Sequence, residues 1–558
     1  KSRMATMKPV GSKTIRLTLC LGLFSALLLT IFACGDGDDD NNLPVPPVET
    51  EPVKVSGIPT VGGLRSFDAF AWAPDSSRIA YIAVQDSNSE ELYSSRPDRP
   101  VNNVKLSSLG TVDSFLWSPD LTVTNLIAFL ADQQFINVNE LYTSTPEVKD
   151  DRNVSGSLEP GGRVTAFYDW AFSASGTSPL VFMAKKDSAT NVELYASFDN
   201  GATIVKLSGD IIPDSGNVVD FAVSPDGRQV AYKADQQVFG KFELYVVPVS
   251  INGGRAINVS RQSTNILEVR DFAWSFDSET IAFRAFNPVP NTIGNVELFT
   301  VPASGGTPVR VSIFPNPDGD VRSFDWAPSD LLLAYTQNTI QGSPDRIDLY
   351  STRPFRQDNN KLSNTTGTGS IISTVRSFKW SPKSLLIAFN VVVRGSGLSE
   401  LLVADANPLA PFPTPVPLSS TLQSFGEVVG FEWSPDSVRV AYRADQFVDN
   451  RFDLFTVLAN GSRPPVLVSR LTNDSSEVRD FAWAPDSSRI AYVADQDAVG
   501  VFELYTDNDV GTSNRRVSAE LSAGENVSAF LWAPDGLLIA YQANQDDINI
   551  DELYTTVP

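Results

Sequence analysis

The side chains that most enzymes use for proton transfer are missing from this chain. Its 558 residues include no histidine, which excludes Ser-His-Asp and Cys-His catalytic sets, histidine metal ligands and imidazole proton transfer. Residues 318–320 and 507–509 offer oxygen ligands suited to calcium, but neither run has the spacing of a calcium loop. We therefore expect no catalytic residue, no metal site and no cofactor, and a protein that is not an enzyme.

Four arginines are the candidate partner-binding residues. Each occupies the second position of a V-R-x-F-x-W segment, and they are Arg270, Arg322, Arg376 and Arg479. Other copies of this segment carry Asp113, Val219, Val429 or Ser528 at that position. Guanidinium groups bind carboxylates through paired hydrogen bonds, so on this chain of formal net charge −23 they predict an anionic or carboxylate-bearing partner. Ion pairs with the neighbouring Asp271, Asp325 and Asp480 are the simpler alternative.

Cys34 is the other chemically distinctive residue. A basic segment is followed by seventeen residues without charge, 17–33, which is typical of a secretory signal. Ile31-Phe32-Ala33-Cys34 resembles a bacterial lipobox. The resemblance implies a lipoprotein signal peptide over residues 1–33, with a diacylglycerol on the Cys34 thiol holding the protein at the membrane. An uncleaved anchor is the alternative, although seventeen residues is short for a bilayer span. Residues 34–52 are acidic and proline-rich, and we predict a disordered tether there.

The rest of the chain consists of one repeated unit. All nine tryptophans occupy the same place in it, at positions 72, 117, 170, 274, 326, 380, 433, 483 and 532, and Val223 takes that place in a tenth copy. Successive positions are 45 to 54 residues apart. Each unit contains four short runs, several of which alternate with the period of two expected of strands. Four short strands, repeated, describe the blade of a β-propeller.

Residues that recur in nearly every unit are assigned to the fold. An acidic residue opens the third run of all ten units: Glu91, Glu140, Glu193, Glu243, Glu297, Asp348, Glu400, Asp453, Glu503 and Glu552. An Ala-Asp motif recurs at Asp132, Asp235, Asp445 and Asp495. A ligand site does not require ten copies. We therefore interpret these acids as hydrogen-bond anchors, and the repeated tryptophans and tyrosines as packing rather than carbohydrate-stacking platforms.

The signature W-[SA]-P-D-x-x-x-I-A-Y…E-L-Y, clearest in residues 478–505, resembles the TolB-type propeller repeat. A related propeller precedes the peptidase domain of prolyl oligopeptidases and dipeptidyl peptidases. The resemblance covers residues 53–558 and implies an all-β fold of ten four-stranded blades. The chain ends on a third strand and begins with an orphan fourth run, 53–57, which can complete the last blade and leave no open edge. We predict one closed ring, with two five-bladed rings as the alternative.

The predicted function follows from charge and resemblance. A net charge of −23 repels phosphate backbones, so no nucleic-acid partner is expected. The role of TolB in envelope complexes implies a lipid-anchored protein–protein interaction scaffold at the bacterial cell envelope. Gly35 after the cysteine resembles the sorting signal for the outer membrane, facing either the periplasm or the cell surface. A protein that binds glycans or cell-wall polymers is the alternative. A carbohydrate-active enzyme that works without histidine is the third possibility, because carboxylates alone can support glycoside chemistry.

Overall fold

The computed structural model describes residues 51–57, 70–86, 88–99, 103–120, 125–171, 178–261, 268–287, 295–313, 319–338, 346–363, 372–393, 398–407, 414–420 and 426–558. The signal segment, Cys34 and most of the tether lie outside these residues. Among the described residues, the only helical segment is the 3-10 turn η1 (Asp199–Gly201). No helix in this part of the chain is long and apolar enough to cross a membrane.

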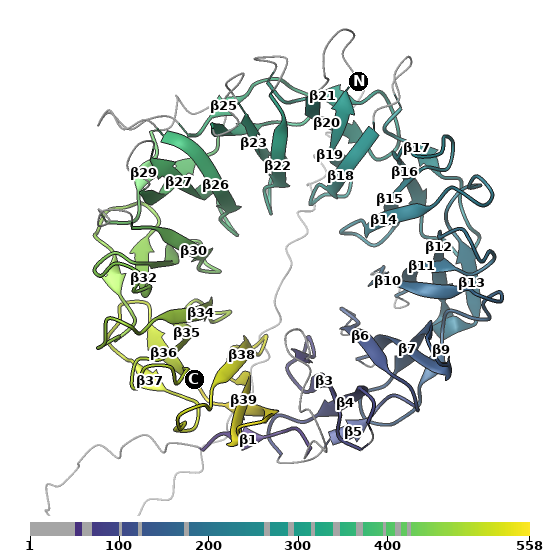
Figure 1. Ribbon diagram of the computed structural model, residues 1–558. Helices are drawn as coiled ribbons and strands as arrows, with labels where there is room; N and C mark the ends of the chain where they lie inside the picture. Colours follow the sequence, from purple (N-terminus) through teal and green to yellow (C-terminus); the bar gives the residue numbers. More distant parts are fainter. Residues whose placement is uncertain are drawn as a thin grey trace, which may run out of the picture. The chain divides into compact units, whose positions relative to one another are not determined.

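The described residues form ten four-stranded sheets, the blades, arranged around a common centre (Figure 1). Blades one to three are β2 (Phe70–Trp72), β3 (Ile79–Ala83), β4 (Glu91–Ser95), β5 (Asn103–Lys105); β6 (Val112–Trp117), β7 (Ile127–Phe135), β8 (Val138–Ser144), β9 (Arg152–Asn153); and β10 (Arg163–Trp170), β11 (Leu180–Lys185), β12 (Glu193–Phe198), β13 (Thr203–Lys206). Blades four to six are β14 (Val218–Val223), β15 (Gln229–Ala234), β16 (Glu243–Pro248), β17 (Ile257–Asn258); β18 (Glu268–Trp274), β19 (Thr280–Asn287), β20 (Asn295–Pro302), β21 (Val309–Arg310); and β22 (Val321–Trp326), β23 (Leu333–Asn338), β24 (Ile347–Thr352), β25 (Asn360–Lys361).

Blades seven to nine are β26 (Ile372–Trp380), β27 (Leu386–Val393), β28 (Ser399–Asp405), β29 (Val416–Pro417); β30 (Val428–Trp433), β31 (Arg439–Ala444), β32 (Asp453–Leu458), β33 (Val466–Leu467); and β34 (Val478–Trp483), β35 (Arg489–Ala494), β36 (Glu503–Asn508), β37 (Arg515–Arg516). Blade ten combines β38 (Val527–Trp532), β39 (Ile539–Asp547) and β40 (Ile550–Thr556) with the N-terminal β1 (Val53–Lys54). The first strand of each blade lies toward the centre (Figure 1).

The two ends of the ring meet inside blade ten, as predicted. β1 pairs antiparallel with β40, Lys54 opposite Tyr554, and the Val55 N–H donates to the Leu553 carbonyl at 2.9 Å. The Lys54 ammonium forms ion pairs with the Glu552 carboxylate and, at 3.0 Å, with that of Asp546. Blade ten then packs against blade one in a single hydrophobic cluster. The prediction of one ring of ten blades is confirmed, and the alternative of two five-bladed rings is wrong.

The tryptophans join each blade to the one before it. All nine lie in the described ranges, and each indole N–H donates to a backbone carbonyl on the first strand of the preceding blade at 3.0–3.5 Å. Trp117 donates to Ala71, for example, and Trp72 closes the circle by donating to Leu531. Val223 has no such donor at the junction of blades three and four. Eight of the rings are buried between neighbouring blades and Trp532 is partly buried, in clusters that draw residues from both blades.

A second link joins the hairpins that follow the first strands. The turn residue at Ser76, Ser278, Ser437 and Ser487 has φ between 62° and 66°. This left-handed conformation is strained for serine and is adopted more readily by glycine. In return, each serine hydroxyl accepts a backbone N–H from the turn of the preceding blade, at 2.8–3.0 Å. The strained serines therefore hold adjacent turns together, where glycine would relieve the strain and lose the bond.

The closure can be tested by deletion. Removing residues 53–57 should lower the melting temperature far more than removing residues 36–45, because only the first deletion takes away β1 and exposes the edge of β40. For scale, Trp483→Ala should reduce the free energy of unfolding by about 3–5 kcal/mol, since its ring is buried between blades. Thermal denaturation followed by circular dichroism measures all three. Equal melting temperatures for the two deletions would contradict terminal closure.

Candidate binding site

The repeated acids serve the fold. In six blades the acid that opens the third strand accepts the hydroxyl of the tyrosine two residues later, at 2.7–3.1 Å. A cation on the fourth strand pairs with the same carboxylate in several blades, as Arg516 does with Glu503 at 3.1 Å. Lys54 does this for Glu552 from the other end of the chain. In these blades the carboxylate therefore joins the third strand to the fourth or to its own tyrosine.

The Ala-Asp motif anchors two loops at once. One oxygen of Asp495 accepts the Glu477 N–H at 2.7 Å, and the other accepts the Gly500 N–H at 2.8 Å. These donors belong to the connection that enters the blade and to the loop after the second strand. Asp132 and Asp235 make the same two kinds of bond. The motif is structural, as interpreted from the sequence.

The tyrosines are stacked inside the blades. Aromatic rings on the second and third strands pair with centroids 5.2–5.7 Å apart in nine blades. Tyr81 and Tyr93, for example, are 0% and 1% exposed. Rings this inaccessible cannot stack on a sugar, so the packing interpretation is confirmed. Burial raises the pKa of Tyr81 and of Tyr232 to about 12. The pKa values of Tyr505 and Tyr554 are raised further, first by burial and then by the hydrogen bond that each hydroxyl donates to a carboxylate.

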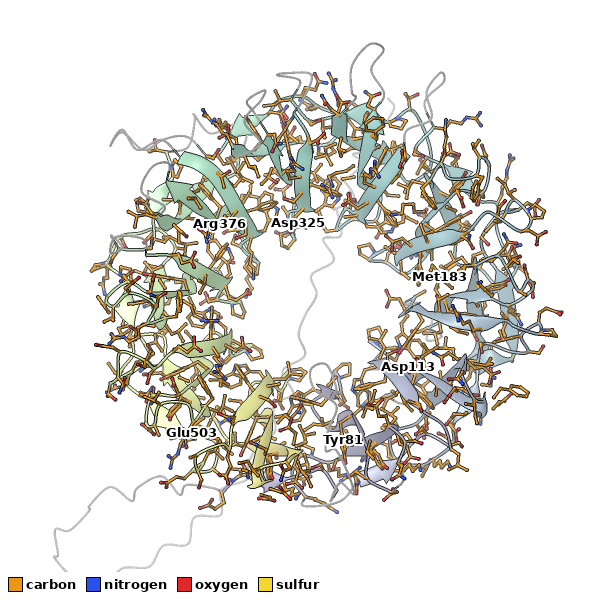
Figure 2. The ribbon with its side chains drawn as sticks, viewed as in Figure 1. Tyr81, Asp113, Met183, Asp325, Arg376 and Glu503 are labelled. Carbon is orange, nitrogen blue, oxygen red and sulfur yellow. The ribbon has the colours of Figure 1, made fainter. Side chains whose placement is uncertain are left out.

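The four candidate arginines lie at β-bulges on the innermost strands. The register of the first strand shifts at the residue after the valine of the V-R-x-F-x-W segment, which is the arginine in blades five, six, seven and nine. A bulge places one residue outside the alternating pattern and redirects its side chain. The side chains of Arg270, Arg376 and Arg479 are 51%, 47% and 56% exposed. Figure 2 places Arg376, Asp113 and Asp325 toward the inner edge of the ring and Glu503 farther out.

Three of these bulges, in blades five, six and nine, are fixed by cationic side chains of the preceding blade, which the sequence analysis missed. The Lys233 ammonium donates to the Arg270 carbonyl at 2.7 Å. Arg284 donates in the same way to the Arg322 carbonyl, and Arg443 to the Arg479 carbonyl. The sequence feature that could have predicted these bonds is the second-strand position of Lys233, Arg284 and Arg443, which varies among the blades. That position holds a cation in blades four, five and eight and an apolar residue in blades one, two, three and nine.

The arginines do pair with acids, but with different ones from those anticipated. Arg270 contacts Glu268 at 3.3 Å, Arg376 contacts Glu427 of the next blade at 3.0 Å, and Arg479 contacts Glu477 at 3.1 Å. Arg322 donates to the Asn338 amide oxygen at 3.3 Å. Asp271 is held instead by Arg284, and Asp325 and Asp480 each accept the N–H of the following residue. The expected pairs are absent because bulging points arginine and aspartate in different directions.

Several inner-wall carboxylates are weakened as acids. Burial raises the pKa of Asp169, Asp220, Asp325 and Asp480, all on first strands. Each therefore stays neutral to a higher pH than a freely exposed aspartate. Of these acids, Asp325 lies in blade six with Arg322, and Asp480 lies in blade nine with Arg479. The first strands of these two blades thus combine an exposed guanidinium group with an acid that is neutralised more easily than a free aspartate.

Within the described residues, no group of three or more cysteine, aspartate or glutamate side chains could hold a metal ion. Residue 318, part of one candidate calcium run, lies outside those residues. In the other run, Asp507 accepts the N–H groups of Asn508 and Ser513 through one oxygen, and Asp509 pairs with Arg439.

Comparisons with known proteins report the fold. No protein-family model matches the chain, and no curated protein sequence matches it. Solved structures that do match include a dipeptidyl peptidase 4 from Porphyromonas gingivalis, with 11% identity over 65% of this chain and 54% of that one and a TM-score of 0.41. A prolyl endopeptidase matches with 14% identity, 66% and 53% coverage and a TM-score of 0.35. The GH74 enzyme of Niastella koreensis matches with 11% identity, 87% and 71% coverage and a TM-score of 0.31.

This chain spans about half the length of both peptidase chains, and at such identities the likeness concerns the propeller alone. The expectation that the protein is not an enzyme is corrected here: these three structures are those of enzymes, and the absence of histidine, on which the expectation rested, does not exclude catalysis. The error was to infer from the absence of histidine that no kind of catalysis is possible. Lack of histidine removes imidazole chemistry, but it leaves carboxylates, which are sufficient for reactions such as glycoside hydrolysis.

Alkaline titration tests the buried tyrosines. In an unfolded chain tyrosine ionises near pH 10, whereas burial raises the pKa of Tyr81 and Tyr232 to about 12. The stability that these groups contribute is therefore complete below about pH 10 and is lost as the pH rises toward 12. Tyrosinate absorbance should increase cooperatively, together with loss of the circular dichroism signal. Tyrosinate formation near pH 10 in a protein that stays folded would contradict the assignment.

Proposed function

We propose that this propeller is a binding scaffold that captures an acidic partner protein with the arginines of blades five, six, seven and nine. The observation that carries the proposal is their confinement to part of a ring whose structural residues recur around it. Side chains needed by every blade, such as the third-strand acids, appear in all ten units. Arg270, Arg322, Arg376 and Arg479 do not. They lie at bulges, three of which are held in place by cations of the preceding blade.

The contacts of these arginines leave room for a partner. Each guanidinium group has five N–H donors, and the pairs with Glu268, Glu427 and Glu477 involve a single guanidinium nitrogen each. The remaining N–H groups can donate to carboxylates of a docking protein. The resemblance to TolB-type repeats, whose namesake acts in envelope complexes, supports a protein as the partner.

We further propose that Cys34 carries the lipid that holds this scaffold at the bacterial envelope, in the outer membrane. The support is the sequence alone, since Cys34 lies outside the described residues. The chain enters the ring at β1, and a lipid on Cys34 would leave the acidic segment 35–52 as the connection between membrane and propeller.

Replacing Arg270, Arg322, Arg376 and Arg479 together with glutamine should weaken partner capture with little change in melting temperature. Exposed ion pairs contribute about 0–1 kcal/mol each, and Arg376, which bridges two blades, should account for most of any loss. Capture from bacterial envelopes, quantified by mass spectrometry, measures the effect. Capture by the wild-type protein should also weaken as salt rises, because charge attraction is screened.

A variant with the same charge change provides the control. Arg99, Arg228, Arg255 and Arg463 are exposed and lie away from the bulges, so their replacement with glutamine should leave capture unchanged. If the bulge variant unfolds while the control does not, the arginines are struts between blades. If it folds and captures the same proteins, the partner binds elsewhere. Either result would overturn the proposal.

The anchor is tested separately. Cys34→Ser should abolish lipidation and leave the precursor uncleaved, because the thiol is the only group on that residue that accepts the diacylglycerol. Mass spectrometry of the N-terminus distinguishes the two forms. An unmodified Cys34 in the wild-type protein would show the lipobox resemblance to be misleading without affecting the arginine proposal.

A further inference from the structure

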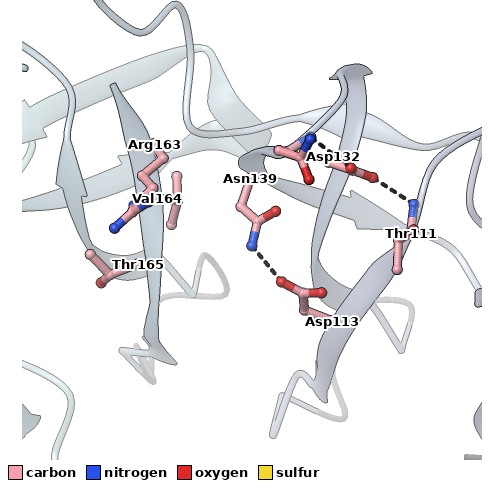
Figure 3. A pocket seen from close by; sticks show the side chains of 8 residues that line it. Thr111, Asp113, Asp132, Asn139, Arg163, Val164 and Thr165 are labelled. Carbon is pink, nitrogen blue, oxygen red and sulfur yellow. Dashed lines mark hydrogen bonds between the residues drawn. The ribbon is translucent and has the colours of Figure 1, made fainter. Parts of the chain in front are cut away.

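A polar cavity of about 490 Å³ lies between blades two and three, away from the four arginines. Blade two supplies Asp113 and Asn139, and blade three supplies Arg163 on the opposite wall (Figure 3). A volume of this size falls within the range of about 300–1,000 Å³ found for small-molecule sites. Val164 contributes the one apolar side chain among the described lining residues, and it is only 1% exposed.

The cavity exists because blade two differs from blades four, eight and nine at the residue before the third-strand acid. In blade nine, Phe502 precedes the third-strand acid, is 3% exposed and lies under the guanidinium of Arg479, 3.2 Å from its ring centroid. Phe242 and Phe452 occupy the same position in blades four and eight. Blade two has Asn139 there and Asp113 at the bulge. The smaller amide leaves open the space that phenylalanine fills elsewhere, and its Nδ2 donates to the Asp113 carboxylate.

Arg163 is a second departure from the repeat. It immediately precedes the first-strand valine, where other blades carry Thr111, Asn217, Glu268, Asp320, Thr374, Glu427, Glu477 or Asn526. Arg163 is therefore the one cation at this position in the part of the chain that the structure describes. Its side chain is exposed, and its guanidinium makes no hydrogen bond or ion pair with another described residue. The fold does not use this charge.

The other polar side chains of the cavity can form hydrogen bonds with the hydroxyl groups of a ligand. The Asn139 amide oxygen is an acceptor turned away from its bond to Asp113, and the Thr165 hydroxyl, which donates to the Met183 carbonyl at 3.1 Å, keeps its acceptor sites. Amides offer donors as well as acceptors, and carboxylates accept only. A hydroxyl group both donates and accepts, so it can pair with either. Walls of this kind without an apolar surface favour a ligand that is polar on all sides.

We propose that this cavity binds an acidic carbohydrate, with the carboxylate of a uronic acid unit on Arg163 and ring hydroxyls on Asp113 and Asn139. Arginine binds a carboxylate through two parallel charge-assisted hydrogen bonds. The acid and amide on the facing wall then select a ligand rich in hydroxyls over a simple carboxylate. The site is independent of the proposed protein-binding arginines, which lie in other blades.

Calorimetry with the full chain tests the proposal, using trigalacturonate, the neutral galactotriose, and glutamate as probes. Trigalacturonate should bind. Galactotriose should bind with an affinity at least about tenfold lower, because loss of a charge-assisted hydrogen bond lowers affinity by that factor or more. Arg163→Gln should reduce trigalacturonate affinity to that of the neutral trisaccharide. Asn139→Phe should abolish binding of both by filling the cavity as in blades four, eight and nine.

Three controls separate binding from folding and from the proposed scaffold function. Arg228→Gln, on a side chain that is 80% exposed at a distant turn, should bind trigalacturonate as the wild type does. So should the variant that lacks all four bulge arginines. Arg163→Gln lies on an exposed residue and should keep the wild-type melting temperature, so it remains informative if Asn139→Phe fails to fold.

Several results would overturn the proposal. One is absence of trigalacturonate binding to the wild-type protein. Another is that galactotriose binds as tightly as trigalacturonate, or that Arg163→Gln binds trigalacturonate as tightly as the wild type. Either result would show that Arg163 does not bind the carboxylate. Glutamate that binds as tightly as trigalacturonate would show that the hydroxyl-binding wall has no role.

Discussion

The structure depends on the bond from each tryptophan indole to the first strand of the preceding blade. A single such hydrogen bond contributes only about 0.5–1.5 kcal/mol, but nine of them run around the ring in the same direction. They fix how far one blade rotates against the next. The hydrophobic clusters lie at these same junctions and take residues from two blades. No blade has a complete core of its own, so the ring must close for the last junction to form.

Closure explains why the N-terminal strand is borrowed. Without β1, blade ten would expose the edge of β40, and Glu552 would lose its Lys54 partner. The same acid–cation pairing holds fourth strands elsewhere, as in Arg310 with Glu297. The chain thus uses a local device of its repeat to join segments that are nearly five hundred residues apart in sequence.

Repetition also creates places where the sequence is free to change. Recurring tryptophans, acids and turn serines fix the ring, whereas the bulge residue and the residue before the third-strand acid differ from blade to blade. Blade nine places Arg479 on Phe502 there, and blade two places Asp113 on Asn139. The pair in blade nine leaves a half-exposed cation at the surface, and the pair in blade two lines a polar cavity. Two kinds of surface arise from the same two backbone positions.

The sequence by itself determined the blade count, the strand pattern and the closure, because each depends on local periodicity and on counting repeats. It also separated recurring structural residues from variable ones. It did not reveal the register shift after Val269 or Val478, the cations that cross to the bulge carbonyls, or the acids that pair with the arginines. These depend on which side chains two adjacent blades bring face to face. The cavity between Asp113 and Arg163 belongs to the same class, since its walls come from different blades and its space from a side chain that is too small to fill it. Contacts between repeats are set by the rotation of one blade against the next, and only the tertiary structure fixes that rotation.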